Sequence, residues 1–188
     1  MGSHNTSASS LSNAAWLEDN IISDVFRFNV FQVEDTVESF NCRPYNRPGY
    51  YMISLHHGHN KLSDANHSYE FQDAALVFSS SKVVYGLEHL GVQQTCYFCV
   101  FTEDFFEKFA GIGTYEVFTD ASAPVLRLTE SQRLEFTSLF VQMMHEITQD
   151  FRLKYDLLRT LVMQLILKAI KLRPARPLHR IPLMPPCG

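Results

Sequence analysis

Hydrophobic residues between positions 24 and 101 come in short bursts separated by turn-forming residues such as Pro48, Gly49, Gly58 and Gly91. The bursts are rich in Val, Phe, Tyr and Ile, which fit pleated, half-buried strands. Strands at this spacing favour a sandwich or a closed barrel over alternating βαβ units. Six strands are therefore predicted, at residues 25–33, 50–57, 68–71, 74–80, 83–88 and 96–101.

The spacing changes to that of helices after residue 101. Thr102 and the acidic residues behind it predict a helix that ends at Gly111, followed by extended pieces at 115–118 and 125–128. Thr129 and Gln132 then fit a capping box, and hydrophobic residues follow at helical spacing up to position 147.

The last predicted helix, residues 154–172, is unusually apolar, because eleven of the sixteen residues in 157–172 are hydrophobic. A helix that is apolar on nearly all sides cannot keep one side in water. Either its own domain wraps it or a second subunit covers its other face. In a chain of 188 residues we expect the second subunit. The predicted dimer interface consists of Leu158, Leu161, Val162, Leu165, Ile166 and Ala169.

Charge is distributed unevenly around the net −4. Residues 1–151 hold 8 basic and 19 acidic residues, a balance of −11, whereas residues 152–188 hold 8 basic and 1 acidic residue, a balance of +7. An acidic main part argues against a protein that coats nucleic acid. No apolar run reaches the 18 or so residues of a membrane span, so no membrane association is expected.

Both ends of the chain differ from the middle. Residues 1–20 are rich in Ser, Asn and Ala and are interpreted as a flexible leader without a secretion signal. Residues 174–188 hold five of the eight prolines and predict an irregular tail or linker. The four cysteines form no disulfide framework, so a cytoplasmic location is expected.

A histidine cluster offers candidate metal chemistry. His57 and His59 are followed by Asp64, and His89 comes later, a pattern that resembles the metal site of cupins. Imidazole nitrogens and a carboxylate could hold a transition metal, which keeps a metal-dependent cupin enzyme as the alternative function. Because Gly58 indicates a turn, we prefer solvated histidines with no metal or cofactor.

Other catalytic patterns are weak in this sequence. Cys96 and Cys99 have C-x-x-C spacing, but they lie in a predicted strand, where residues i and i+3 point to opposite faces. Neither a Gly-x-Ser-x-Gly elbow nor a glycine-rich phosphate loop is found in the sequence. We therefore do not expect an enzyme.

Six sequence segments, taken in order, resemble those of a known protein family. They are FNVFQVE (28–34), PYNR (44–47), YMISLHHG (51–58), ALVFSS (75–80), YFCVFTEDF (97–105) and KYDLLR (154–159). Together they resemble the N-terminal sensor region of AraC-type bacterial transcription regulators, most closely the group in Bacteroidetes.

The resemblance implies a mainly β fold with C-terminal α structure: a cupin-like β-barrel (jelly roll) followed by an α-helical hairpin. The expected divisions are a barrel at 21–128 that binds an effector, a dimerisation hairpin at 129–173 and the tail at 174–188. In this family a helix-turn-helix domain that binds DNA follows, and we expect it to be missing from this chain. An orphan sensor that blocks a full-length regulator by forming heterodimers is a further possibility.

Period two along the predicted strands selects candidates for the effector pocket. Residues 52, 54 and 56 share one face of their strand, residues 97 and 99 share a face of another, and residue 85 could border the same opening. Each position could equally be plain core. The pocket candidates are Met52, Ser54, His56, Tyr85, Tyr97 and Cys99, and the ligand is expected to be a small-molecule effector.

Overall fold

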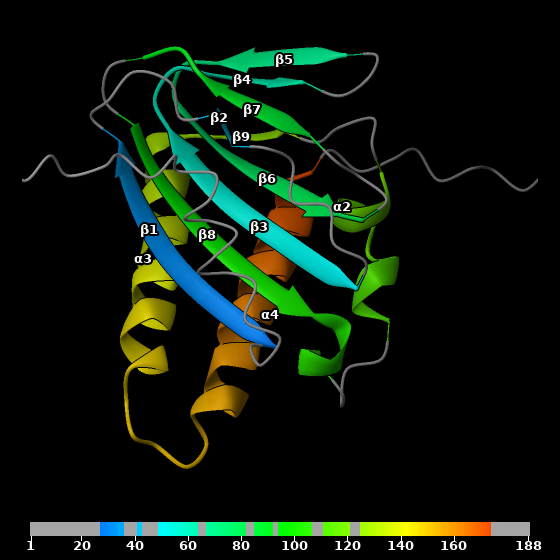
Figure 1. The fold of residues 1–188 in the computed structure, drawn as a ribbon, viewed down its shortest axis with the longest axis vertical. Helices are drawn as coiled ribbons and strands as arrows, with labels where there is room; N and C mark the ends of the chain where they lie inside the picture. The colour runs from blue at the N-terminus through cyan, green and yellow to red at the C-terminus, as the bar shows by residue number, and fades with distance from the viewer. Residues whose placement is uncertain are drawn as a thin grey trace, which may run out of the picture.

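The fold is built from two antiparallel sheets and a C-terminal pair of helices (Figure 1). This computed structural model describes residues 27–35, 41–42, 49–63, 67–81, 85–91, 94–106, 111–120 and 125–173. The predicted leader, the tail and Asp64 lie outside these ranges. The strands are β1 (Phe28–Asp35), β2 (Asn41–Cys42), β3 (Tyr50–His57), β4 (Asn60–Ser63), β5 (Ser68–Phe71), β6 (Ala74–Ser80), β7 (Gly86–His89), β8 (Gln94–Thr102) and β9 (Val125–Leu128).

The strand order is that of a jelly roll. One sheet runs β1-β8-β3-β6-β9 and the other runs β2-β7-β4-β5. The first eight strands form nested pairs, β1 with β8, β2 with β7, β3 with β6 and β4 with β5, which is how a jelly roll winds. The predicted fold class, mainly β with C-terminal helices, is therefore confirmed.

Two long helices cover one face of the five-stranded sheet (Figure 1). Helix α3 (Glu130–Ile147) is capped by Thr129, whose side chain accepts a hydrogen bond from the Gln132 backbone while the Gln132 side chain accepts one from the Thr129 backbone. The predicted capping box is thus present. Helix α4 (Lys154–Leu172) packs beside α3, and side chains from both helices share one core with strand residues such as Ile53.

Helix α4 is also tied to the short helices that follow β8. These are the 3-10 helices η1 (Glu103–Phe106) and η2 (Ile112–Thr114) and the helical turn α2 (Glu116–Thr119). Arg159 donates a hydrogen bond from Nε to the Phe105 carbonyl oxygen at 2.5 Å, and its guanidinium lies 5.0 Å from the centre of the Phe105 ring. Arg173, at the end of α4, forms an ion pair with Asp120.

One strand was missed and one local prediction was wrong. Residues 60–63, for which no strand was predicted, form β4, in which Asn60 and Leu62 are buried and their neighbours are not. Residues 116–118, predicted to be extended, belong to the helical turn α2. Val117 and Phe118 are adjacent and both buried, and an alternating strand would bury only one of such a pair.

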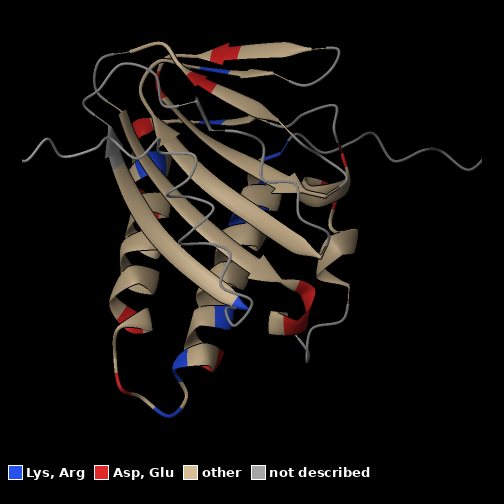
Figure 2. Cartoon of the chain, in the orientation of Figure 1, with Lys and Arg blue, Asp and Glu red and all other residues tan. Residues whose placement is uncertain are grey.

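Charged residues avoid the central strands. Strands β3, β6 and β8 contain no Lys, Arg, Asp or Glu, and Figure 2 shows the charges on the helices, on the four-stranded sheet and near the ends of the strands. Among the described residues, no helix is long and apolar enough to cross a membrane.

Candidate functional site

The two faces of β3 meet different surroundings. Ile53 and Leu55 belong to the core shared with the helices. The next residue along, His56, has its ring 5.7 Å from that of Phe98 on β8 and 6.4 Å from that of Phe71 on β5, in the four-stranded sheet. The face that carries His56 is therefore the one that looks toward the other sheet. By strand alternation, Ser54 and Met52 lie on this face as well.

His56 is the centre of a buried polar cluster. Its Nε2 lies 2.7 Å from Ser54 Oγ, and its Nδ1 lies 3.2 Å from Cys96 Sγ on β8. The side chain is 1% exposed. Burial, followed by the nearby His89, lowers the pKa of His56 to about 3. The imidazole is consequently neutral near pH 7, with one nitrogen that donates and one that accepts.

His89 brings the second sheet to this cluster. It lies on β7, opposite Asn60 of β4 in the strand register. Its ring centre is 6.4 Å from that of His56, and its ring nitrogens have no contact with solvent. Two imidazoles, a hydroxyl and a thiol thus meet between the sheets, beside the rings of Phe71 and Phe98.

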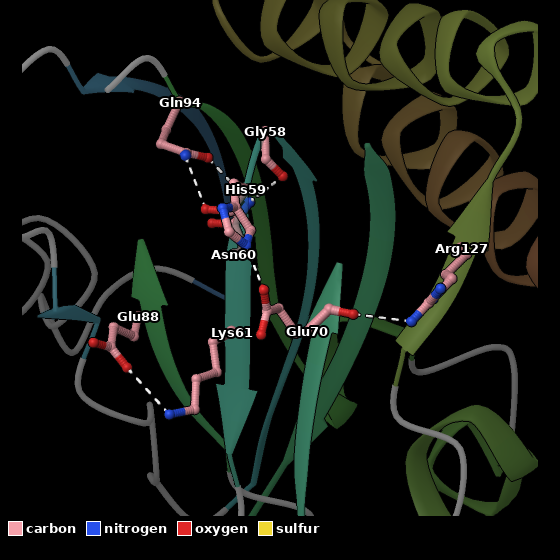
Figure 3. A network of polar contacts seen from close by, with 8 residues as sticks. All are labelled: Gly58, His59, Asn60, Lys61, Glu70, Glu88, Gln94 and Arg127. Carbon is pink, nitrogen blue, oxygen red and sulfur yellow. Dashed lines mark hydrogen bonds and ion pairs between the residues drawn. The ribbon is translucent and has the colours of Figure 1, made fainter. Parts of the chain in front are cut away.

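A network of side-chain amides surrounds the β3–β4 turn (Figure 3). Asn60 Nδ2 donates to the Gly58 carbonyl oxygen at 2.9 Å and to Gln94 Oε1 at 3.0 Å, and Gln94 Nε2 donates to the His59 carbonyl oxygen at 3.0 Å. The contacts join the β3–β4 turn to the start of β8. Asn60 Oδ1 is buried and accepts no hydrogen bond from the described residues.

Charged contacts lie on the outer side of this network (Figure 3). His59 Nε2 is 2.6 Å from Glu70 Oε1, and Arg127 Nη2 donates to the Glu70 carbonyl oxygen at 2.9 Å. Lys61 Nζ lies 3.7 Å from Glu88 Oε2. These side chains are largely exposed, so the contacts orient the surface more than they stabilise it.

The pocket candidates separate into two groups. Met52, Ser54 and His56 share the inner face, and Tyr85 packs in the core between the sheets. Tyr97 and Cys99 do not join them, because both pack in the core beneath the helices, where the Tyr97 ring lies 5.7 Å from that of Phe140.

Tyr97 and Cys99 were assigned to the wrong face of β8. The register pairs Ser54 with Phe98 and His56 with Cys96, so the even-numbered residues of β8 face the other sheet. Cys96 and Phe98 are site residues that the sequence prediction missed. Only the pairing register of β3 with β8 could have identified them. Cys96 and Cys99 are both unbridged and lie on opposite faces, as the strand interpretation predicts, and burial raises the pKa of the Cys99 thiol.

The predicted dimer interface on α4 was also wrong in its residues. All six predicted side chains are between 0% and 6% exposed within a single chain, where they pack in the core shared with α3 and the sheet. They are not available to a second subunit. The residues are Leu158, Leu161, Val162, Leu165, Ile166 and Ala169.

The metal alternative gains no support from the described residues. No group of three or more His, Cys, Asp or Glu side chains among them is placed to hold a metal ion. His59 contacts Glu70 on the outside, His89 lies against His56 on the inside, and His57 is exposed at the end of β3.

The fold and the site define a jelly-roll domain with a neutral polar cluster between its sheets and a helical hairpin on one outer face. No family model matches the chain, and no curated protein matches it. Among solved structures it is similar to ToxT from Vibrio cholerae.

Three ToxT structures illustrate the extent of this similarity. An apo form from strain SCE256 has a TM-score of 0.48 at 14% identity over 78% of this chain and 56% of that chain. A P21 crystal form has a TM-score of 0.46 at 12% identity, over 78% of this chain and 57% of that chain. ToxT from Vibrio cholerae O395 has a TM-score of 0.46 at 14% identity, over 79% of this chain and 56% of that chain. This chain thus spans little more than half of their length.

Proposed function

We propose that this chain is the effector-sensing and dimerisation region of an AraC-type transcription regulator that acts in the bacterial cytoplasm. One observation carries the proposal: a neutral polar cluster lies on the inner faces of β3 and β8, whose outer faces pack against the helices. Small-molecule sites are mostly apolar spaces with a few well-placed polar groups. The sequence segments that resemble AraC-type regulators indicate the class of regulator.

A signal has a short path from this cluster to the helices. Cys96 contacts His56 on one side of β8, and the adjacent Tyr97 contacts Phe140 of α3 on the other side. A ligand that displaces one face of β8 therefore changes the packing of the other. Such a ligand alters the output only if it binds the two arrangements with different affinity.

The chemistry of the cluster points to an uncharged effector. The buried polar side chains of the described residues include no Lys, Arg, Asp or Glu; they are Ser54, His56, Asn60, Ser79, Ser80 and Gln94. A carboxylate or phosphate between the sheets would lack a counter-charge from these residues, which is costly in a desolvated place. A neutral hydroxylated or aromatic molecule can use the imidazoles, the hydroxyl and the Phe rings.

DNA recognition is assigned to a helix-turn-helix domain outside this chain. The acidic balance of residues 1–151 disfavours contact with phosphates, so the sheets and α3 are unsuited to bind DNA themselves. In this proposal two copies pair through the helical hairpin and thereby position two DNA-binding domains.

Thermal unfolding of the purified chain with a panel of neutral sugars, polyols and phenols, and with matched carboxylates, tests the sensor. We expect a neutral compound to raise the melting temperature, since ligand that binds only the folded state stabilises it. The shift should be lost in Ser54→Ala and kept in Tyr97→Phe, which changes the opposite face. Selection of the carboxylates, or equal shifts in both variants, would contradict the proposed site.

A further inference from the structure

Cys96 lies in a buried row of three side chains that can act together on a proton. The thiol Sγ is 3.2 Å from His56 Nδ1, and His56 Nε2 is 2.7 Å from Ser54 Oγ. With the thiol donating to Nδ1, the imidazole carries its hydrogen on Nε2 and donates to Ser54 Oγ. The row thus has the order of an activated nucleophile: a thiol, a base within hydrogen-bond distance, and a third group that orients the base.

The same face of β8 leads from the thiol to an unsatisfied acceptor. Gln94 and Cys96 are two residues apart on the strand, so both project toward the other sheet. Gln94 Oε1 accepts a hydrogen bond from Asn60 Nδ2 at 3.0 Å, whereas Asn60 Oδ1, on a residue that is 0% exposed, accepts none from the described residues. A buried carbonyl oxygen without a donor is costly, so a donor on a bound molecule would be stabilising there.

Asn60 also faces the row from the opposite sheet. In the strand register it pairs with Phe71 on one side and with His89 on the other, and residues paired in this way project from the same face of a sheet. The rings of Phe71 and His89 are each 6.4 Å from the ring of His56. The thiol, the base and the unsatisfied acceptor are therefore grouped between the sheets.

We propose that Cys96 binds the effector covalently, and that the effector is a neutral α,β-unsaturated carbonyl compound with a hydroxyl or amide donor. The sulfur forms a bond to the β-carbon while the π electrons of the C=C bond shift toward the carbonyl oxygen. His56 Nδ1 takes the thiol proton and returns it to the α-carbon, so the addition needs no oxidant and expels no leaving group. The donor of the effector pairs with Asn60 Oδ1. The inference rests on the proposed function and specifies the class of effector.

Burial makes this thiol selective. Cys96 is 2% exposed, so only a molecule that enters between the sheets can reach it. Burial, followed by the nearby His89, lowers the pKa of His56 to about 3, so the resting protein stores no thiolate–imidazolium pair and the imidazole is free to accept a proton. Cys99 is the matched control within the chain, because it lies on the opposite face of β8, in the core beneath the helices.

The probe is 2-hydroxyethyl acrylate, which is neutral and unsaturated and carries a hydroxyl donor. In full-length chain with Cys42→Ser and Cys187→Ser, intact-mass measurement and peptide mapping should show one adduct at Cys96 and none at Cys99. The rate should saturate with probe concentration, because binding precedes reaction. The saturated analogue 2-hydroxyethyl propionate should compete without forming an adduct. Methyl acrylate, which lacks the hydroxyl, should reach half-saturation at about fivefold higher concentration.

The variant His56→Gln separates this mechanism from reaction through unfolding. Loss of the base should slow the modification of Cys96 by at least about tenfold. The variant also loses a buried hydrogen bond, so modification through unfolding would instead become faster. A faster reaction in His56→Gln, a rate that rises linearly with probe concentration, or labelling of Cys99 as fast as Cys96 would overturn the proposal. So would the absence of an adduct at Cys96, and if a neutral compound still stabilises the chain, the sensor proposal stands without the covalent step.

Discussion

His56 on β3 and Cys96 on β8 are in contact through their side chains, with 3.2 Å between Nδ1 and Sγ in a fully buried position. The second imidazole nitrogen is used by Ser54. One residue therefore joins two neighbouring strands on the face between the sheets. Several properties of this residue can be measured in the purified chain.

Replacement of His56 by Ala should destabilise the fold. The change removes two buried hydrogen bonds and leaves a void beside Phe98, which together cost about 2 to 3 kcal/mol. His57→Ala is the matched control, because the neighbouring histidine is exposed and should change stability by less than about 0.5 kcal/mol. Urea unfolding of both variants measures the difference, and equal midpoints would contradict the buried role of His56.

His56 should also make stability depend on pH in a defined window. Its folded-state pKa of about 3 lies below the ordinary value of 6.5, so the unfolded state takes up a proton at higher pH than the folded state. The stability contribution is therefore complete above pH 6.5 and is lost as the pH falls toward 3, by up to about 1.4 kcal/mol for each pH unit. Unfolding of wild type and His56→Gln from pH 7 to pH 4 isolates this term. Parallel pH profiles would show that His56 is not kept neutral by the fold.

The buried side and the exposed side of α4 should respond differently when a leucine is shortened to alanine. Leu165→Ala empties a site in the shared core and should cost about 2 to 5 kcal/mol. Leu167→Ala shortens a side chain that is half exposed and should cost less than about 1 kcal/mol in the dilute chain. Chemical unfolding at low protein concentration compares them. A larger loss of stability for Leu167→Ala than for Leu165→Ala would mean that the buried and exposed sides of α4 are assigned the wrong way round.

Gly113 should accept a side chain only with a loss of stability. A Cβ at this position would lie 2.1 Å from the Tyr51 hydroxyl oxygen and 3.0 Å from Cζ of the same ring. Tyr51 is held against Phe101 and Phe118, so the ring cannot move away without further cost. Gly113→Ala should therefore lose about 1 to 3 kcal/mol.

Gly86→Ala is the control for that variant, since its nearest atom is a backbone oxygen 3.8 Å away. Tyr51→Phe should restore part of the stability of Gly113→Ala, because it removes the closest atom. Thermal melts of the single and double variants give the coupling.

The cap of α3 gives a prediction of smaller size. Thr129→Ala removes the side-chain acceptor for the Gln132 backbone and should cost about 1 kcal/mol, whereas Thr129→Ser keeps the hydroxyl and most of the stability. Melting temperatures of the two variants distinguish loss of the cap from loss of the threonine methyl group. If serine were as costly as alanine, the methyl group would be the stabilising part.

Local signals in the sequence were sufficient for much of this fold. Period two placed Met52, Ser54 and His56 on one face, and the Thr129 and Gln132 pair marked the start of α3. These features depend on neighbours along the chain. The assignment of Tyr97 and Cys99 failed because the face of β8 is set by its register with β3, which joins residues 38 to 52 positions apart.

The error on α4 has a different physical origin. Its sequence is apolar on two sides, and composition does not reveal which side the chain itself will cover. In the fold, the core beneath the helices takes Leu158, Leu165 and their neighbours, and leaves Leu157 and Leu167 outside. The predicted dimer interface was the more continuous apolar side of α4, and a single folded chain buries that side in its own core.

The ion pair between Arg173 and Asp120 has a mechanical consequence for the last helix. Both side chains are largely buried, so the last turn of α4 is fastened to the body of its own subunit. Arg159 ties the first half of the same helix to Phe105 of η1. Because both contacts would have to break before α4 could slide along its axis, the helix moves together with η1 and α2 as one unit.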